Sequence, residues 1–140
     1  MPHEATRRLE FDAGHRVPEH GGKCRTPHGH RYAVDVTVRG PLGREGFVLD
    51  FGEIKAKLGA WIDEHLDHTT IYQRGDSLME AMAALNRAAK LKPYYAMDAA
   101  PTAEALAELI FGVAQRLLNA EVVRVNVHET PNCSAAASIA

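Results

Sequence analysis

Two segments near the N-terminus alternate between apolar and polar residues, and a histidine stands where each segment meets the loop between them. The segments are residues 7–15 and 30–38, and residues 17–27 form a loop that contains glycine and proline. One face of the two segments carries Leu9, Phe11, Ala13 and His15, then His30, Tyr32, Val34, Val36 and Val38. Alternation of this kind predicts half-buried strands, which the loop would join as an antiparallel pair that ends at Gly40-Pro41.

Three later segments change to helical spacing. The first, residues 51–65, has Asp50 in the position of an N-cap. The second, residues 78–91, is rich in alanine and ends before Pro93. Thr102 can cap a third helix, since helical spacing separates its apolar residues Leu106, Leu109, Ile110, Val113 and Leu117.

The chain closes with alternating residues that predict two more strands. Val123, Val125, Val127 and Glu129 share one face, Pro131-Asn132 reads as a turn, and residues 133–139 form a weaker last strand. Segregated strands and helices favour the α+β class, here a four-stranded antiparallel sheet with helices on one face. So small a sheet has exposed edges, which are usually paired between subunits, so we expect an oligomer.

Composition excludes several classes of protein. With 140 residues, 46% of them apolar, residues 1–140 are expected to form one domain. A net charge of -2 argues against a nucleic-acid partner, and the apolar stretches are too short to span a membrane. Residues 1–8 are charged where a signal peptide would be apolar, and two cysteines make no disulfide framework. A reducing, cytoplasmic location is the expectation.

Three histidines predict a metal site. His28 and His30 are two residues apart at the start of a strand, so their side chains project from the same face. His15 ends the neighbouring strand on the face shared with Leu9 and Phe11. Three neutral imidazoles around one point are typical of zinc with an open fourth position, which is the arrangement of catalytic zinc.

Cys24 allows three interpretations. Its neighbours Lys23 and Arg25 are cationic, and cationic surroundings favour the thiolate. The sulfur could be a fourth ligand that closes the metal site, a catalytic thiolate beside an open site, or an inert surface thiol. Sequence spacing does not separate these three.

Two further sets of ionisable residues are candidates. Asp67 and His68 could poise a proton carrier, but adjacent side chains do not normally face one another, so spacing alone favours a solvated helix end. Glu129 lies where the alternation would place another apolar residue. A carboxylate in that position must be paired, protonated or bound to a ligand unless it lies at the solvent boundary.

Six motifs, in order along nearly the whole chain, resemble the 6-pyruvoyltetrahydropterin synthase family. They are FDAGH at 11–15, CRTPHGH at 24–30, VLDF at 48–51, LDH at 66–68, PTAE at 101–104 and VHETP at 127–131. The resemblance implies the T-fold, in which strands from several subunits assemble into a barrel, commonly as a homo-hexamer.

The resemblance also implies roles for residues of this chain. It implies that the zinc ligands are His15, His28 and His30, and that the general base is Cys24. Asp67 and His68 would form the proton relay of this base, and Glu129 would anchor the pterin ring. Thr102 and Glu104 match the segment that helps line the pterin pocket, usually from a neighbouring subunit.

The family's chemistry would be a zinc-dependent lyase reaction on 7,8-dihydroneopterin triphosphate. Three residues separate Cys24 from His28, and this spacing resembles the bacterial branch, which forms 6-carboxy-5,6,7,8-tetrahydropterin and acetaldehyde for queuosine and related deazapurines. A pyruvoyl-forming enzyme and an idle pterin-binding protein are the alternatives. Residues 72–100 depart from the family pattern as an inserted helical segment, which could be a lid, an oligomer contact or a wall that selects substrate.

Overall fold

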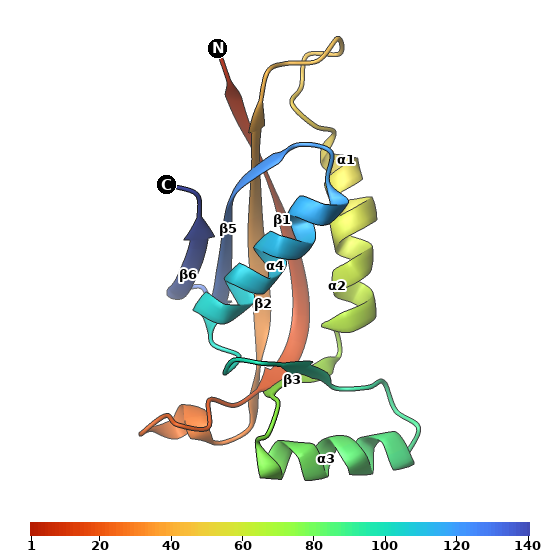
Figure 1. Ribbon diagram of the computed structural model, residues 1–140, viewed down its shortest axis with the longest axis vertical. Helices are drawn as coiled ribbons and strands as arrows, with labels where there is room; N and C mark the ends of the chain where they lie inside the picture. Colours follow the sequence, from red (N-terminus) through yellow and green to blue (C-terminus); the bar gives the residue numbers. More distant parts are fainter.

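The computed structural model describes residues 1–140, which form a six-stranded sheet in the order β4-β3-β1-β2-β5-β6 (Figure 1). Four strands pair antiparallel within it: β1 (His3–His15), β2 (His28–Gly40), β5 (Glu121–Thr130) and β6 (Cys133–Ser138). The predicted N-terminal pair and C-terminal hairpin are therefore confirmed. Both strands of the first pair extend further than the alternation indicates, β1 by four residues at its start and β2 by two residues at each end.

The prediction of only four strands is wrong, because two short strands extend the sheet beyond β1. β3 (Thr69–Gln73) pairs parallel with the end of β1, and β4 (Tyr95–Met97) pairs parallel with β3. Both lie in or beside the segment 72–100, where the sequence predicts helix. Short strands without alternation are not distinguishable from helix by periodicity, which explains the omission.

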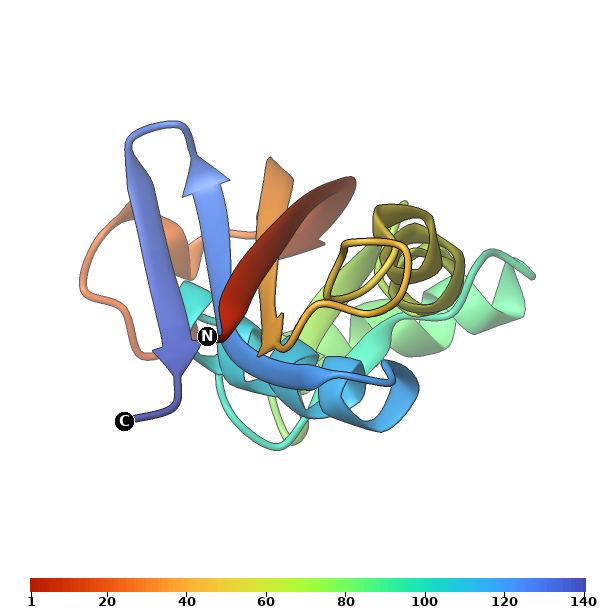
Figure 2. The same cartoon turned by 90° about the horizontal axis from the view of Figure 1, so that it is seen from above.

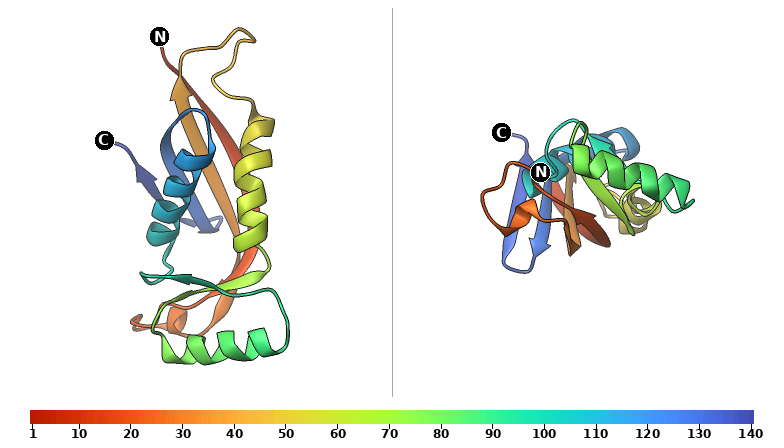
Figure 3. Two further views of the ribbon diagram at one scale, coloured as in Figure 1. Left: turned by 45° about the vertical axis from the view of Figure 1, so that its right-hand side comes forward. Right: turned by 90° about the horizontal axis from the view of Figure 1, so that it is seen from below.

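The predicted alanine-rich helix is confirmed as α3 (Ser77–Ala88), which connects β3 to β4 and ends three residues before the predicted position 91. A parallel pair of strands needs a crossover connection, and α3 supplies it. The helix lies at one end of the molecule, beside the loop that joins β1 to β2 (Figure 3).

Two other helical runs cover one side of the curved sheet (Figure 2). The first is continuous: α1 (Phe51–Ile54), a π-helical turn over Lys55–Gly59, and α2 (Ala60–His65). The second is α4 (Ala103–Leu117). The predicted caps are confirmed, since the Asp50 carboxylate accepts from the Gly52 amide at 2.8 Å and the Thr102 hydroxyl accepts from the Ala105 amide at 3.1 Å.

The core lies between this helical layer and the sheet. α4 contributes six buried residues to the core that it forms with the inner faces of β1, β2 and β5: Ala103, Leu106, Ala107, Ile110, Val113 and Ala114. None of the helices combines the length and the apolar character that crossing a membrane would require. β1 ends and β2 begins at the end of the sheet where β3 and α3 lie, so this end collects the histidines (Figure 1).

An ion pair fastens α3 to the end of β1. Two nitrogens of the Arg16 guanidinium donate to the two carboxylate oxygens of Asp76, each at 2.7 Å, and the Asp76 side chain is 1% exposed. Asp76 also caps α3 by accepting from the Met79 amide. The hydrogen bonds from Arg16 hold the pKa of Asp76 below its ordinary value.

We expect Asp76→Asn to lower the free energy of unfolding by about 2 kcal/mol at pH 7, because a charge-assisted pair is lost. Since the folded pKa of Asp76 is depressed, its contribution is present above the ordinary carboxyl pKa of about 3.9 and disappears as the pH falls through the folded value. Urea unfolding at pH 7 and at lower pH measures this: the difference between wild type and variant should shrink in acid. An equal difference at every pH would contradict the assignment.

Candidate metal centre

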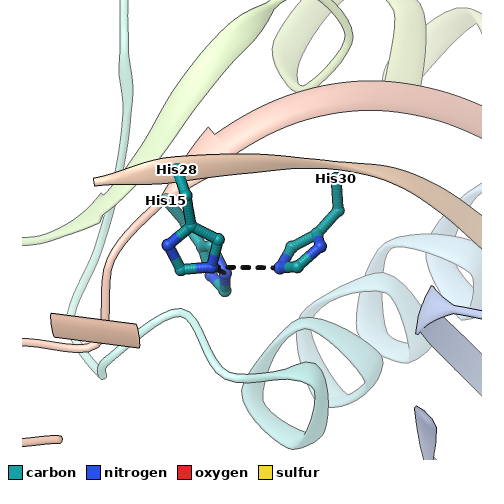
Figure 4. Close-up of side chains that lie close together, drawn as sticks. All are labelled: His15, His28 and His30. Atoms are coloured by element: carbon teal, nitrogen blue, oxygen red, sulfur yellow. Dashed lines mark hydrogen bonds between the residues drawn. The ribbon is translucent and has the colours of Figure 1, made fainter. Parts of the chain in front are cut away.

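Three imidazoles converge at the end of the sheet where β1 meets β2. The antiparallel register places His15 opposite His28, and Ala13 opposite His30, so all three histidines lie on the inner face. The Nε2 atoms of His15 and His28 are 3.2 Å apart, and those of His28 and His30 are 3.1 Å apart (Figure 4). Their ligand atoms form one group that could hold a metal ion.

The hydrogen bonds of the outer ring nitrogens favour a metal between the inner ones. His15 Nδ1 donates to the Pro101 carbonyl at 2.7 Å, and His28 Nδ1 donates to the Thr26 carbonyl at 2.6 Å. Neutral rings in these tautomers turn two Nε2 lone pairs toward one another, which a cation would relieve. Two nitrogens bound at tetrahedral angles to one zinc-sized ion lie about 3.3 Å apart, close to the observed separations.

Burial favours the neutral form, which is the form that binds metal, in two of these imidazoles. His15 is 1% exposed. Burial lowers the pKa of His15 and of His30, and it outweighs the Glu129 carboxylate, which raises both values. A site of neutral nitrogens beside one carboxylate suits a divalent cation.

Tyr32 is a member of the site that sequence reasoning placed only in the strand pattern. Its ring lies 5.4 Å from that of His30 and 5.9 Å from that of His15, and it is fully buried. Its hydroxyl has no hydrogen-bond partner in the chain, as is typical where a ligand or water completes the bonding. Burial, and then the charge of Glu129, raise the pKa of Tyr32. Tyr32 shares strand parity with His28 and His30, and only this parity in the sequence indicates that it belongs to the site.

Glu129 lies beside the three histidines. Its Oε2 is 3.6 Å from Nε2 of His30, and its side chain is 24% exposed. The carboxylate is therefore partly open to solvent at the end of β5, and one side of it faces the metal ligands. A carboxylate in this position can accept hydrogen bonds from the N–H groups of a bound ligand.

Cys24 lies in a short 3-10 helix, Lys23–Arg25, within the loop between β1 and β2. The Val17 amide donates to its backbone carbonyl at 2.9 Å, which closes the loop, and the residue is half-buried. The sulfur is absent from the group of metal-ligand atoms formed by the three histidines. The interpretation of Cys24 as a fourth ligand that closes the site therefore has no geometric support.

Asp67 and His68 do face one another, although spacing alone favours a solvated helix end. His68 Nδ1 and Asp67 Oδ2 are 2.8 Å apart, and 73% of the His68 side chain is exposed. A left-handed backbone at His68, with φ of 59°, turns the two side chains together. Burial alone would raise the pKa of Asp67, but hydrogen bonds from the Asp12 amide and from His68 hold it below its ordinary value.

The Asp67–His68 pair lies on the face of the sheet opposite to the three histidines. Its ligand atoms group with those of Asp12, and Asp12 and His15 are three residues apart on β1, so their side chains point to opposite faces. A shallow hollow of about 420 Å³ beside His68 is lined by Asp12, Arg31 and six other residues, His30 among them. Within one chain, the sheet therefore separates this pair from the metal centre.

Thr102 and Glu104 lie in different surroundings, although both belong to the start of α4. Thr102 caps α4 and directly follows Pro101, whose carbonyl accepts the hydrogen bond from His15. Its neighbour in the chain therefore contacts the candidate metal centre. Glu104 is exposed and lines a hollow between α4 and the edge strand β6. The structure brings neither side chain into hydrogen-bond contact with the three histidines.

We expect His28→Ala to lower the affinity for divalent metal by about 100-fold or more, because one of three ligands is lost. Competition with a chromophoric chelator measures the affinity. His3→Ala is the matched control, since His3 is exposed at the distant start of β1 and should leave the affinity unchanged. Equal affinities in the two variants would contradict the assigned metal centre.

Comparison of the sequence with family models and with characterised proteins gives one consistent answer. The model of the 6-pyruvoyl tetrahydropterin synthase family matches residues 4–139. A 6-carboxy-5,6,7,8-tetrahydropterin synthase of Rickettsia bellii is 38% identical over 135 residues, which cover 93% of this chain and 96% of that protein. A probable enzyme of the same name from Halobacterium salinarum is 34% identical over 92% of this chain and 82% of its own length.

Solved structures show the same fold. A protein from Wolinella succinogenes superposes with a TM-score of 0.82 at 22% identity, over 99% of this chain and 98% of its own. The 6-pyruvoyl tetrahydropterin synthase of Caenorhabditis elegans gives 0.72 at 21% identity, over 100% and 97% of the two chains. The expectation of the T-fold is confirmed, with six strands per chain in place of four. The chain belongs to the 6-pyruvoyl tetrahydropterin synthase family.

Proposed function

We propose that this protein is a zinc-dependent lyase that converts 7,8-dihydroneopterin triphosphate into 6-carboxy-5,6,7,8-tetrahydropterin, with release of acetaldehyde and triphosphate. The convergence of three imidazoles beside one carboxylate is the observation that carries the proposal. The names of the relatives at 34–39% identity favour the carboxy-forming reaction over the pyruvoyl-forming one. Its product would serve queuosine and deazapurine synthesis in the cytoplasm.

His15, His28 and His30 would hold the zinc ion, and their donor set fits it. When bound, zinc supplies a Lewis acid that polarises the oxygens of the substrate side chain. The Pro101 and Thr26 carbonyls fix the tautomers of His15 and His28 and so keep Nε2 available. The same two hydrogen bonds hold both rings in orientation before any ligand arrives.

Glu129 would bind the pterin ring through the guanidine-like N–H edge of that ring. A carboxylate matches two such donors, and its position 3.6 Å from His30 would set the ring beside the metal centre. Cys24, on the half-buried loop of the same chain, would move a proton to or from the substrate side chain. Thr102 and Glu104 would line the pocket from a neighbouring subunit.

Asp67 and His68 would complete the site of a neighbouring subunit. Because the sheet separates them from the zinc ligands of their own chain, a single chain offers no site with both parts. His68 Nδ1 donates to Asp67, so Nε2 is left free on an exposed ring that can carry a proton. A homo-oligomer, which we propose to be a hexamer, would bring this ring to the partner's Cys24.

Product analysis tests the reaction. We expect mass spectrometry of zinc-loaded protein with 7,8-dihydroneopterin triphosphate to show 6-carboxytetrahydropterin together with acetaldehyde. Cys24→Ala should abolish turnover with zinc still bound, because Cys24 is proposed to move protons and not to bind metal. A pyruvoyl product would move the protein to the other branch, and an inactive zinc-loaded protein would contradict the proposal.

Mixing two inactive variants tests whether the site is shared. If Cys24 and His68 of different chains meet, co-expressed Cys24→Ala and His68→Ala chains should recover about one quarter of the wild-type activity, since random assembly completes that share of sites. Purified oligomers of each variant alone provide the baseline. If both residues act within one chain, no mixed oligomer contains an intact site, and the activity should stay at the baseline.

A further inference from the structure

The inserted segment reaches the Asp67–His68 pair through Lys92. Its ammonium donates to the backbone carbonyl of Asp63 at 2.6 Å and to the carbonyl of Asp67. Lys92 follows α3 in the chain, 25 residues after Asp67, so the contact joins the insert to the end of α2.

The Asp63 carbonyl needs such a donor. At the end of α2 the amides of Leu66 and Asp67 both donate to the Ile62 carbonyl, at 2.8 and 2.9 Å. The helix therefore closes one residue early, and the Asp63 carbonyl is left without a backbone donor. A lysine at a helix C-terminus satisfies such carbonyls and interacts favourably with the helix dipole.

The backbone that Lys92 holds is the one that carries the proton relay. His68 has φ of 59°, a left-handed conformation that costs about 1 kcal/mol or more for a residue with a side chain. The His68 amide donates to the Asp12 carbonyl at 2.7 Å, and the Asp12 amide donates to Asp67 Oδ1 at 3.0 Å. These two bonds fix one side of the turn, and Lys92 fixes the other.

Lys92 is itself held from both directions. Asn86 of α3 donates to the Lys92 carbonyl at 2.7 Å, and the next residue, Pro93, accepts from the Thr69 hydroxyl at 2.7 Å. The ammonium is thus presented to the turn by α3 on one side and by the β3–β4 pair on the other. The positive charge of Lys92 also helps to lower the pKa of the Asp67 carboxyl, after the hydrogen bonds from Asp12 and His68.

We propose that Lys92 is a positioning residue for the Asp67–His68 pair: by tying together the carbonyls of Asp63 and Asp67, it fixes the left-handed turn that presents the His68 imidazole. The catalytic consequence rests on the proposed function, whereas the structural one does not. The segment 72–100 would then brace the Asp67–His68 pair from outside the sheet.

Kinetics of Lys92→Met test the catalytic consequence. We expect kcat to fall about 10- to 100-fold with KM and zinc affinity within about twofold of wild type, because a misplaced proton carrier slows the chemical step and leaves the zinc ligands on the other face intact. Lys92→Arg, which keeps charge and donors, should restore most of kcat. Lys90→Met is the matched control, since exposed Lys90 makes no side-chain hydrogen bond. A kcat for Lys92→Met equal to that of Lys90→Met would overturn this part.

Two measurements test the positioning without turnover. Hydrogen exchange of the His68 amide should be about tenfold faster or more in Lys92→Met than in Lys90→Met. In the folded wild-type protein, an amine-methylating reagent should modify Lys90 well before Lys92, which also covers the case of an unstable variant. Unchanged exchange, or equal modification of the two lysines, would overturn the inference. Because neither readout needs substrate, an inactive wild-type protein would refute the proposed function alone.

Discussion

The pairing register of β1 with β2 determines where the three histidines of the candidate metal centre lie. It sets His15 opposite His28 and Phe11 opposite Tyr32, and the Phe11 and Tyr32 rings stack with centroids 4.9 Å apart. A slip of one residue would turn the histidines of one strand to the other face and expose its core residues at the same time. Hydrophobic burial therefore holds the three histidines on one face of the sheet.

Much of this arrangement can be predicted from sequence, because local patterns determine it. Strand parity places His15, His28 and His30 on one face, and Asp50 and Thr102 cap their helices as their positions indicate. Parity also places Tyr32 in the site, but a tyrosine in an apolar pattern gives no separate signal of a functional role. Glu129 interrupts the apolar alternation of its strand, and the resemblance to a known family implies its role in binding the pterin ring.

The remainder depends on contacts between distant parts of the chain. β3 and β4 are short and lack alternation, so only the pairing of β3 with β1 and of β4 with β3 distinguishes them from helix. The contact between Asp67 and His68 needs a left-handed residue after the end of α2, and the sequence Leu-Asp-His does not predict one. Lys92 is one of several charged residues in its segment, and only the tertiary structure shows that it satisfies carbonyls at another helix end.

The segment 72–100 is bonded to the rest of the fold near both of its ends. Arg16, directly after His15, forms an ion pair with Asp76 at the start of α3, and Lys92 donates to backbone carbonyls of the turn before β3. A crossover fixed at two points is more rigid than a lid that opens, since each contact joins it to a different element. It also adds strands to the free edge of β1 near the histidines, whereas residues 3–12 of β1 have β2 as their only partner strand. Those open edges, and the Asp67–His68 pair on the face opposite the histidines, both agree with the proposed homo-oligomer, in which a second copy would complete the site.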